Sequence, residues 1–202
     1  MTRVRRKSSL NYLLVFGFAA VSAFGQVSAV RSGSFEVGPF AGASYGIDKF
    51  HAMAGGNVTY AINKYILPYF EYSYFPGIPH TVSGGGCSAT LSTSLNDVHG
   101  GVHVRLPFLK ESPVVPYLVF GMGVIDYPDR KTSVSCQGLS LTVPFQGGAD
   151  FTINAGGGLR YYIGASGRFG LRAEAKVYKP ETGPFSNDTF GKVELGVFFQ
   201  LR

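Results

Sequence analysis

The chain contains no tryptophan, only two cysteines and few charged residues, which make up 15% of its 202 residues. Globular domains carry about 25% charged residues on average. Low charge combined with 17 phenylalanines and 12 tyrosines excludes a disordered acidic or basic tail, which needs the opposite composition. The 28 glycines argue against a coiled coil or an ordinary α/β enzyme, because glycine destabilises helix interiors. The length fits one domain with a sizeable core.

The excess of positive charge is confined to the start of the chain. The formal net charge is +6, but Arg3, Arg5, Arg6 and Lys7 stand together near the N-terminus. Without these four, 14 basic and 12 acidic residues remain. A nearly neutral body lacks the clustered basic face that nucleic acid requires, so we expect no nucleic-acid partner.

Only one long hydrophobic run is present, and it follows the basic cluster at residues 12–24. A charged segment, a short apolar run and then small residues are typical of a secretory signal peptide. We expect residues 1–25 to be removed after Gly25, with cleavage after Ala29 as the alternative. The run is short for a retained membrane anchor, and no cysteine near it offers a lipid attachment site. Residues 26–33 then form a short N-terminal segment, and we interpret the organism as bacterial.

The body of the chain, residues 34–202, alternates between apolar and polar or small residues. In the clearest example, Val98, Gly100 and Val102 alternate with Asp97, His99 and Gly101. A period of two is the signature of a β-strand. The pattern predicts eight strands of about 12 residues, longer than the 5–6 usual in soluble proteins and long enough to cross a bilayer. The expected strands are 34–45, 53–62, 65–74, 95–106, 114–125, 149–163, 169–178 and 190–202.

The two faces of these strands differ in a way that indicates a membrane. One face is rich in Val, Leu, Phe and Tyr and nearly free of charge, whereas the other carries glycine and most of the ionisable residues. We therefore predict an all-β fold, an eight-stranded antiparallel up-and-down transmembrane β-barrel with its apolar face toward lipid. Charges inside a narrow lumen are expensive unless they pair, so we expect an ion network. Its predicted members are Glu36, Glu71, Asp97, His99, His103, Arg105, Arg160, Arg172, Glu174, Lys176, Lys192 and Glu194.

The expected connections alternate in length, as they do in outer-membrane barrels. Those at 46–52, 75–94, 126–148 and 179–189 are long or moderate, and those at 63–64, 107–113 and 164–168 are short. Both cysteines, Cys87 and Cys136, fall in long loops on the same side. An even cysteine count in an exported protein favours a disulfide between them, and the alternating segments around each cysteine can extend the strands and bring the two level.

Other interpretations of single residues carry less weight. His99 and His103 lie on one face of a strand about 13 Å apart, too far to chelate one ion alone, so we interpret them as hydrogen-bonded lumen residues. A lipid hydrolase would need a serine beside a histidine at the outer rim, and His80 and Ser83 lack an evident third partner. We expect no catalytic, metal or cofactor site. A soluble ligand-binding barrel would need an apolar cavity, and the predicted interior is too charged for that.

The chain resembles the small bacterial outer-membrane β-barrel family, which includes the membrane domain of outer membrane protein A and the opacity-type proteins. The segments that carry the resemblance are PYLVFGMG at 116–123, NAGGGLRYY at 154–162, GLRAEA at 170–175 and VELGVFF at 193–199. The family usually ends its last strand on an aromatic residue, whereas this chain continues from Phe199 to Arg202.

The resemblance implies a non-enzymatic monomer in the bacterial outer membrane with a structural, adhesive or envelope-integrity role. A narrow channel for small solutes is the alternative. The implied partners are outer-membrane lipid and lipopolysaccharide, the outer-membrane insertion machinery, and an extracellular ligand held by the loops.

Overall fold

The computed structural model describes residues 31–47, 49–106, 112–136, 139–164, 166–182 and 189–201. The predicted signal peptide, with either cleavage site, lies outside these residues. No helix within the described ranges is long and apolar enough to cross a membrane. The described chain forms ten β-strands: β1 (Phe35–Ile47), β2 (Lys49–Tyr60), β3 (Ile66–Gly84), β4 (Cys87–Arg105), β5 (Val114–Tyr127), β6 (Arg130–Cys136), β7 (Leu139–Phe145), β8 (Gly148–Ile163), β9 (Phe169–Pro180) and β10 (Phe190–Leu201).

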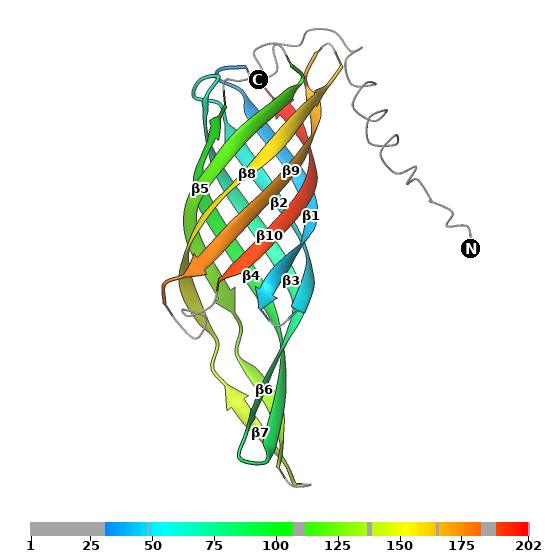
Figure 1. Ribbon diagram of the computed structural model, residues 1–202, viewed down its shortest axis with the longest axis vertical. Helices are drawn as coiled ribbons and strands as arrows, with labels where there is room; N and C mark the ends of the chain where they lie inside the picture. The colour runs from blue at the N-terminus through cyan, green and yellow to red at the C-terminus, as the bar shows by residue number, and fades with distance from the viewer. Residues whose placement is uncertain are drawn as a thin grey trace, which may run out of the picture.

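Eight of these strands close into a barrel. The order of neighbours is β3-β2-β1-β10-β9-β8-β5-β4, and pairing of β3 with β4 completes the ring, as Figure 1 shows. Every ladder is antiparallel, including the one between the first and last strands, where Phe35 lies opposite Leu201. The predicted up-and-down eight-stranded antiparallel barrel is confirmed. Closure leaves no open edge in the wall, so each barrel strand has a hydrogen-bonding neighbour on both sides.

The wall turns its apolar side chains outward and its charged ones inward. Leu195 is 66% exposed and Met122 is 61% exposed, whereas Glu71 and Lys192 are each 1% exposed. A soluble barrel would bury the apolar face instead, because burial of apolar surface is what stabilises it in water. This inverted arrangement is that of a transmembrane barrel, whose outer face meets hydrocarbon.

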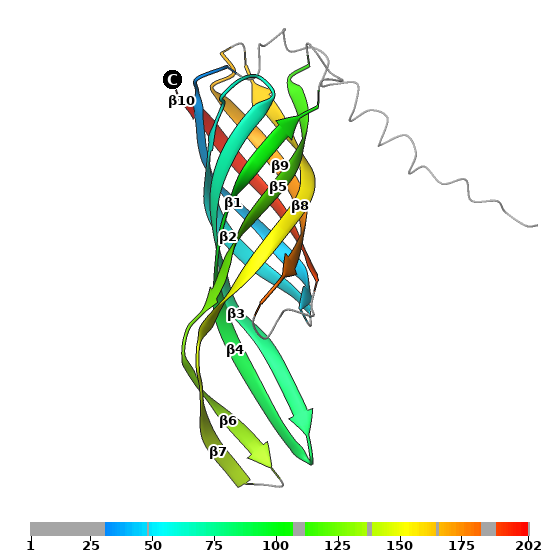
Figure 2. The same ribbon diagram turned by 90° about the vertical axis from the view of Figure 1, so that its left-hand side faces the viewer.

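The two ends of the barrel are built differently. At one end, here called the terminal end, lie the start of β1, the end of β10 and the β2–β3 and β8–β9 turns (Figure 1). At the other, the hairpin end, two long hairpins project beyond the wall (Figure 2). One is formed by the outer parts of β3 and β4, strands of 19 residues each. The other is formed by β6 and β7, which are 7 residues each.

The projecting hairpins correct part of the sequence interpretation. Segments 75–94 and 126–148 were expected to be long loops, but most of their residues lie in β-strands. The predicted extension of the strands around the two cysteines is confirmed, since Cys87 lies opposite Cys136 in a ladder. The β3–β4 hairpin closes through Gly85 and Gly86, whose φ values are 57° and 79°. A two-residue turn with positive φ at both positions matches the right-handed twist of the flanking strands and favours glycine at both.

The expected loop at 46–52 is also wrong. β2 begins at Lys49 rather than near Met53, and the ladder from β1 continues through Ser44 opposite His51 to Ile47 opposite Lys49. The register shifts between Ser44 and Ile47. Gly46, with φ of 121°, allows this irregularity because glycine lacks the Cβ that would oppose a positive φ. The bulge hid the strand, because one extra residue interrupts the alternation on which the expectation rested.

Candidate functional site

The lumen contains a network of ions centred on Glu71 of β3. Its Oε1 accepts from the ammonium groups of Lys176 on β9 and Lys192 on β10, each at 2.7 Å. Lys192 also lies 3.1 Å from Asp97 Oδ2 on β4 and donates to Ser73 Oγ at 2.5 Å. One carboxylate therefore ties together strands from opposite sides of the barrel. Buried ions are tolerated only with partners of this quality.

Three further ion pairs extend this centre across β9 and β10. Lys176 Nζ lies 2.6 Å from Glu174 Oε1 on its own strand. Arg172 Nη2 donates to Glu194 Oε1 at 2.8 Å and lies 3.6 Å from Glu71 Oε2. Alternate residues on a strand share a face, which is why the segment from Arg172 to Lys176 sends three charges into the lumen. All of these groups are buried.

A second group of ions lies nearer the terminal end. Arg160 Nε is 3.0 Å from Glu36 Oε2, and the hydroxyl of Tyr162 donates to Glu36 Oε1 at 2.5 Å. The guanidinium of Arg160 also stacks over the ring of Tyr117, 4.2 Å from its centroid. His103 joins the two groups, because its Nδ1 is 2.6 Å from Arg160 Nη2 and its Nε2 is 3.5 Å from a Glu174 oxygen.

The two histidines of β4 have separate partners. His99 pairs with Asp97 through Nδ1 and with Thr152 Oγ1 through Nε2, the latter at 2.5 Å. His103 bonds to Arg160 and Glu174, as described above. Both side chains are buried in the lumen, and they share no partner among the described residues. Three carboxylates, those of Glu71, Glu174 and Glu194, approach one another within 4.8 Å, but the ammonium of Lys176 contacts all three.

Arg105 stands apart from the other predicted lumen residues. It is the last residue of β4, is only half-buried and forms no ion pair with any residue that the structure describes. The strand ends there at the terminal rim, where water can solvate a guanidinium. The remaining eleven predicted members are buried inside the barrel, and the structure brings them together in the two groups described above.

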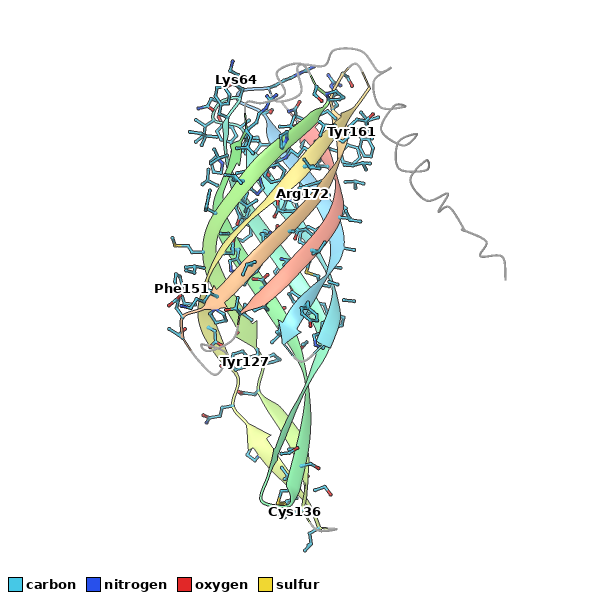
Figure 3. The ribbon with its side chains drawn as sticks, viewed as in Figure 1. Lys64, Tyr127, Cys136, Phe151, Tyr161 and Arg172 are labelled. Carbon is cyan, nitrogen blue, oxygen red and sulfur yellow. A yellow bond between two sulfur atoms is a disulfide. The ribbon has the colours of Figure 1, made fainter. Side chains whose placement is uncertain are left out.

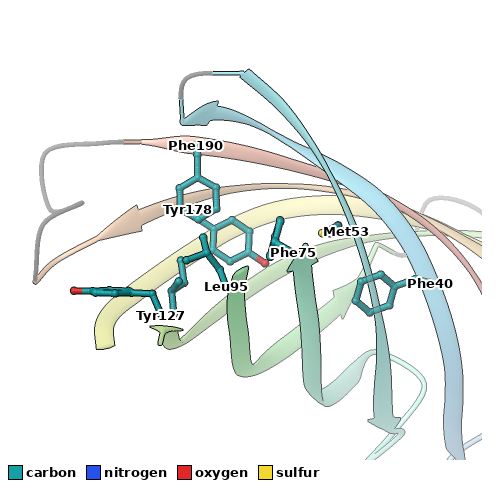
Figure 4. Packing of buried hydrophobic residues seen from close by; sticks show 8 residues of the cluster. Phe40, Met53, Phe75, Leu95, Tyr127, Tyr178 and Phe190 are labelled. Atoms are coloured by element: carbon teal, nitrogen blue, oxygen red, sulfur yellow. The ribbon is translucent and has the colours of Figure 1, made fainter. Parts of the chain in front are cut away.

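Apolar side chains occupy the lumen on both sides of the ions. The larger cluster extends to the hairpin end and includes Phe75, Leu95, Tyr127 and Phe190 (Figure 4). A smaller cluster at the terminal end comprises Ala61, Leu67, Val115, Tyr162 and Phe198. The lumen is crowded enough that a Cβ added at Gly158 would stand 2.5 Å from the Tyr117 hydroxyl. An eight-stranded barrel has only enough room for its own side chains.

The lumen also holds residues that were not among the predicted members of the ion network. Tyr117 donates to Glu174 at 2.6 Å, and Tyr69 donates to Asn154 at 3.2 Å. Asp150 and Tyr178 are fully buried. Alternation could have found the last two, because Asp150 precedes Thr152 by two residues and Tyr178 follows Lys176 by two. The hydrogen-bonding partners depend on the stagger of distant strands, which no local pattern encodes.

The second candidate site is the sheet beyond the hairpin end. Here β4 pairs with β6, with Cys87 opposite Cys136, and β6 pairs with β7. Together with the outer part of β3 they form a four-stranded antiparallel sheet, here called the external sheet. The predicted disulfide between Cys87 and Cys136 is present, at the position labelled Cys136 in Figure 3. It links the two hairpins covalently where their ladder is only three residue pairs long.

Solved structures of other proteins share this architecture. Neisserial surface protein A aligns with a TM-score of 0.52 at 16% identity, covering 83% of this chain and 97% of that one. Ail, the attachment invasion locus protein of Yersinia pestis, aligns with a TM-score of 0.50 at 14% identity, covering 85% and 100%. The chain has the fold of the small outer-membrane β-barrels. Ail in complex with the heparin analogue sucrose octasulfate aligns at 13% identity and a TM-score of 0.50, with the same coverage. No protein-family model matches the chain, and no curated protein matches its sequence.

Proposed function

We propose that this protein is a non-enzymatic barrel of the bacterial outer membrane whose external sheet binds a ligand outside the cell. The observation that carries the proposal is the external sheet, which projects from one end of the barrel and is closed by the Cys87–Cys136 bond. For the external sheet to lie outside the cell, the terminal end must face the periplasm and the hairpin end the exterior. Barrels with short periplasmic turns and longer outer loops have this orientation. A signal peptide cleaved after Gly25 would deliver the chain.

The composition of the external sheet favours a neutral ligand. Residues 75–94 and 132–148 contain no Asp, Glu, Lys or Arg. They are rich in Ser, Thr and Gly, and Leu139 and Leu141 are exposed. Such a surface offers hydroxyls, backbone groups and apolar side chains rather than charge. A neutral polysaccharide or a protein surface fits it better than a polyanion, because a polyanion gains most of its affinity from cations.

The lumen supports a structural rather than a conducting role for the barrel wall. Ions of both signs are paired across it, and apolar clusters lie on either side of them. A solute would have to displace these side chains and leave buried charges unpaired. The channel alternative therefore has the weaker support, and single-channel conductance in planar bilayers tests it.

The binding proposal is tested by attachment of vesicles that carry the purified protein to immobilised matrix glycoproteins and neutral polysaccharides. We expect attachment that persists at high salt, and its loss when residues 78–92 are replaced by a two-residue Asn-Gly turn. The matched control replaces Lys64 at the terminal end by Ala, which should leave attachment unchanged. Attachment that vanishes with salt, or that survives the shortened hairpin, would contradict the role given to the external sheet.

A further inference from the structure

We propose that the outer wall of the barrel carries a binding site for one two-chain phospholipid of the periplasmic leaflet, with its acyl chains on either side of Pro39 and its phosphate at Arg31 and Arg168. Pro39 stands in the middle of β1 and faces outward. The site is independent of the ligand proposed for the external sheet, and it lies nearer the other end of the barrel.

The first hollow lies over β8, β9, β10 and β1. It has a volume of about 660 Å³. Its outward-facing lining is almost wholly apolar, and the inward-facing Phe40, Arg172 and Gly196 contribute to its floor. The hollow exists because the small side chains of Ala41 and Ala173 lie between larger ones. The outward lining residues are Pro39, Ala41, Leu159, Tyr161, Leu171, Ala173, Leu195 and Val197.

A second hollow of about 480 Å³ lies on the other side of Pro39, over β10, β1, β2 and β3. It is lined by Val37, Val58, Phe70 and Phe199 around Gly56. A methylene group takes up about as much space as a liquid water molecule, roughly 30 Å³. The two hollows therefore have room for about 22 and about 16 methylene groups, enough for one acyl chain each. Two adjoining hollows that share a single proline fit a lipid with two chains better than one with a single chain.

The lining of each hollow includes a residue near the terminal end of its strand, Tyr161 on β8 in the first and Val37 on β1 in the second. Tyr161 lies on the outer wall near that end (Figure 3), the depth at which tyrosine commonly marks the boundary of a bilayer. Arg168 is three residues from Leu171 along the chain, which is about 10 Å in an extended strand. Arg31 lies beside the same β8–β9 turn, because its guanidinium donates to the carbonyl oxygen of Ser166 at 2.9 Å.

Charge distinguishes the two ends of the barrel. The described cations at the terminal rim are Arg31, Lys64, Arg105 and Arg168. The exposed acids of the described chain lie at the hairpin end instead, at Asp126, Asp129 and Glu181. Arg168 is exposed and forms no ion pair with a described residue. A phosphate at the mouth of the hollows would therefore meet cations without a competing carboxylate, which makes an anionic headgroup the best fit.

Native mass spectrometry of the purified barrel tests the site. The protein is folded into vesicles of equal parts phosphatidylethanolamine and phosphatidylglycerol, extracted with detergent, and examined for retained lipid. We expect one phosphatidylglycerol per barrel. Ala173→Phe, which fills the first hollow, should abolish retention, and Ala155→Phe, an exposed position on β8 outside both hollows, should not.

The headgroup contact is tested separately, with variants of Arg31 and Arg168. Both residues lie outside the strands of the barrel wall, so these substitutions do not threaten folding. Arg31→Gln and Arg168→Gln should each lower the retained fraction about fivefold, whereas Lys64→Gln, in the β2–β3 turn of the same rim, should leave it unchanged. Equal losses for Lys64→Gln and Arg168→Gln would overturn the proposal, as would equal losses for Ala155→Phe and Ala173→Phe. Retention of added lipopolysaccharide in place of phosphatidylglycerol, or of no lipid at all, would overturn it too.

Discussion

The barrel lumen and the external sheet are stabilised in opposite ways. In the lumen, charges from β1, β3, β4, β8, β9 and β10 meet in a space closed to water, and each ion depends on partners from distant parts of the chain. The external sheet contains almost no charge, is ordered by local hairpin ladders and is joined by one covalent bond. Because every lumen ion depends on several strands, the barrel unfolds cooperatively, whereas the external sheet can open without unfolding the barrel.

The largest effect should come from removing one lumen cation. Lys192→Met leaves Asp97 without its lysine and removes one of the two lysines from Glu71, and breaking a buried pair in this way costs about 3–5 kcal/mol. The matched control is Lys179→Met, because Lys179 pairs with Glu181 at 3.7 Å on the exposed surface, where a pair is worth at most about 1 kcal/mol. Urea unfolding of the protein in vesicles measures both. Equal losses would mean that the lumen is wetter than its burial indicates.

A charge on the lipid face should have the next largest effect. Leu195→Arg places a guanidinium on the outer wall of β10, where transfer into the hydrocarbon costs about 2–4 kcal/mol near the bilayer midplane. Ser88→Arg adds the same charge to the exposed external sheet and should be nearly neutral. The fraction that reaches the folded form, measured by heat-dependent migration in gels, checks the pair. Impaired folding of Ser88→Arg would mean that the external sheet, too, lies against lipid.

Loss of the disulfide should act locally. The double variant Cys87→Ser, Cys136→Ser releases a link between residues 49 apart in the chain. Loop closure over that length is worth about 4 kcal/mol, an upper value because the barrel strands already restrain both hairpins. Amide hydrogen exchange in β6 and β7 should then accelerate by up to about 100-fold, while exchange in β9 stays unchanged. Acceleration in β9 to the same degree would show that the external sheet and the barrel open together rather than independently.

How much of the fold could be predicted depends on what the alternation of apolar and polar residues encodes. Strict alternation in segments such as Leu171–Val177 predicted both the strand and its buried face, because side chains on a strand have a fixed period of two. The first and last barrel strands and the side on which both cysteines lie followed from the same count. Alternation failed at Gly46, where a bulge adds a residue. In segments 75–94 and 126–148 it indicated strands only around the two cysteines, because the Ser, Thr and Gly content of the rest is typical of loops.

Which charges pair could not be predicted, since pairing depends on the stagger between strands. Glu71 and Lys192 are 121 residues apart and meet only because the barrel closes with one particular shear. Arg105 has the same place in the alternation as His103, yet it lies at the rim because the strand ends there. The hollows beside Pro39 were also invisible in the sequence, because they arise from small residues on four adjacent strands.

The smallest signal is expected from conduction. In planar bilayers the wild-type protein should show at most small, intermittent currents, because Tyr117, Arg160 and Phe198 fill the lumen between its ends. Phe198→Ala would widen the terminal-end cluster but leave the ion pairs of Glu71 in place, so it should raise the current only slightly. Lys192→Met tests the paired ions, the other barrier to conduction, in the same assay. Mock incorporation of detergent alone sets the baseline. Large, stable steps from the wild-type monomer would show that the paired ions move aside readily, and the contrast between a sealed lumen and a mobile external sheet would no longer hold.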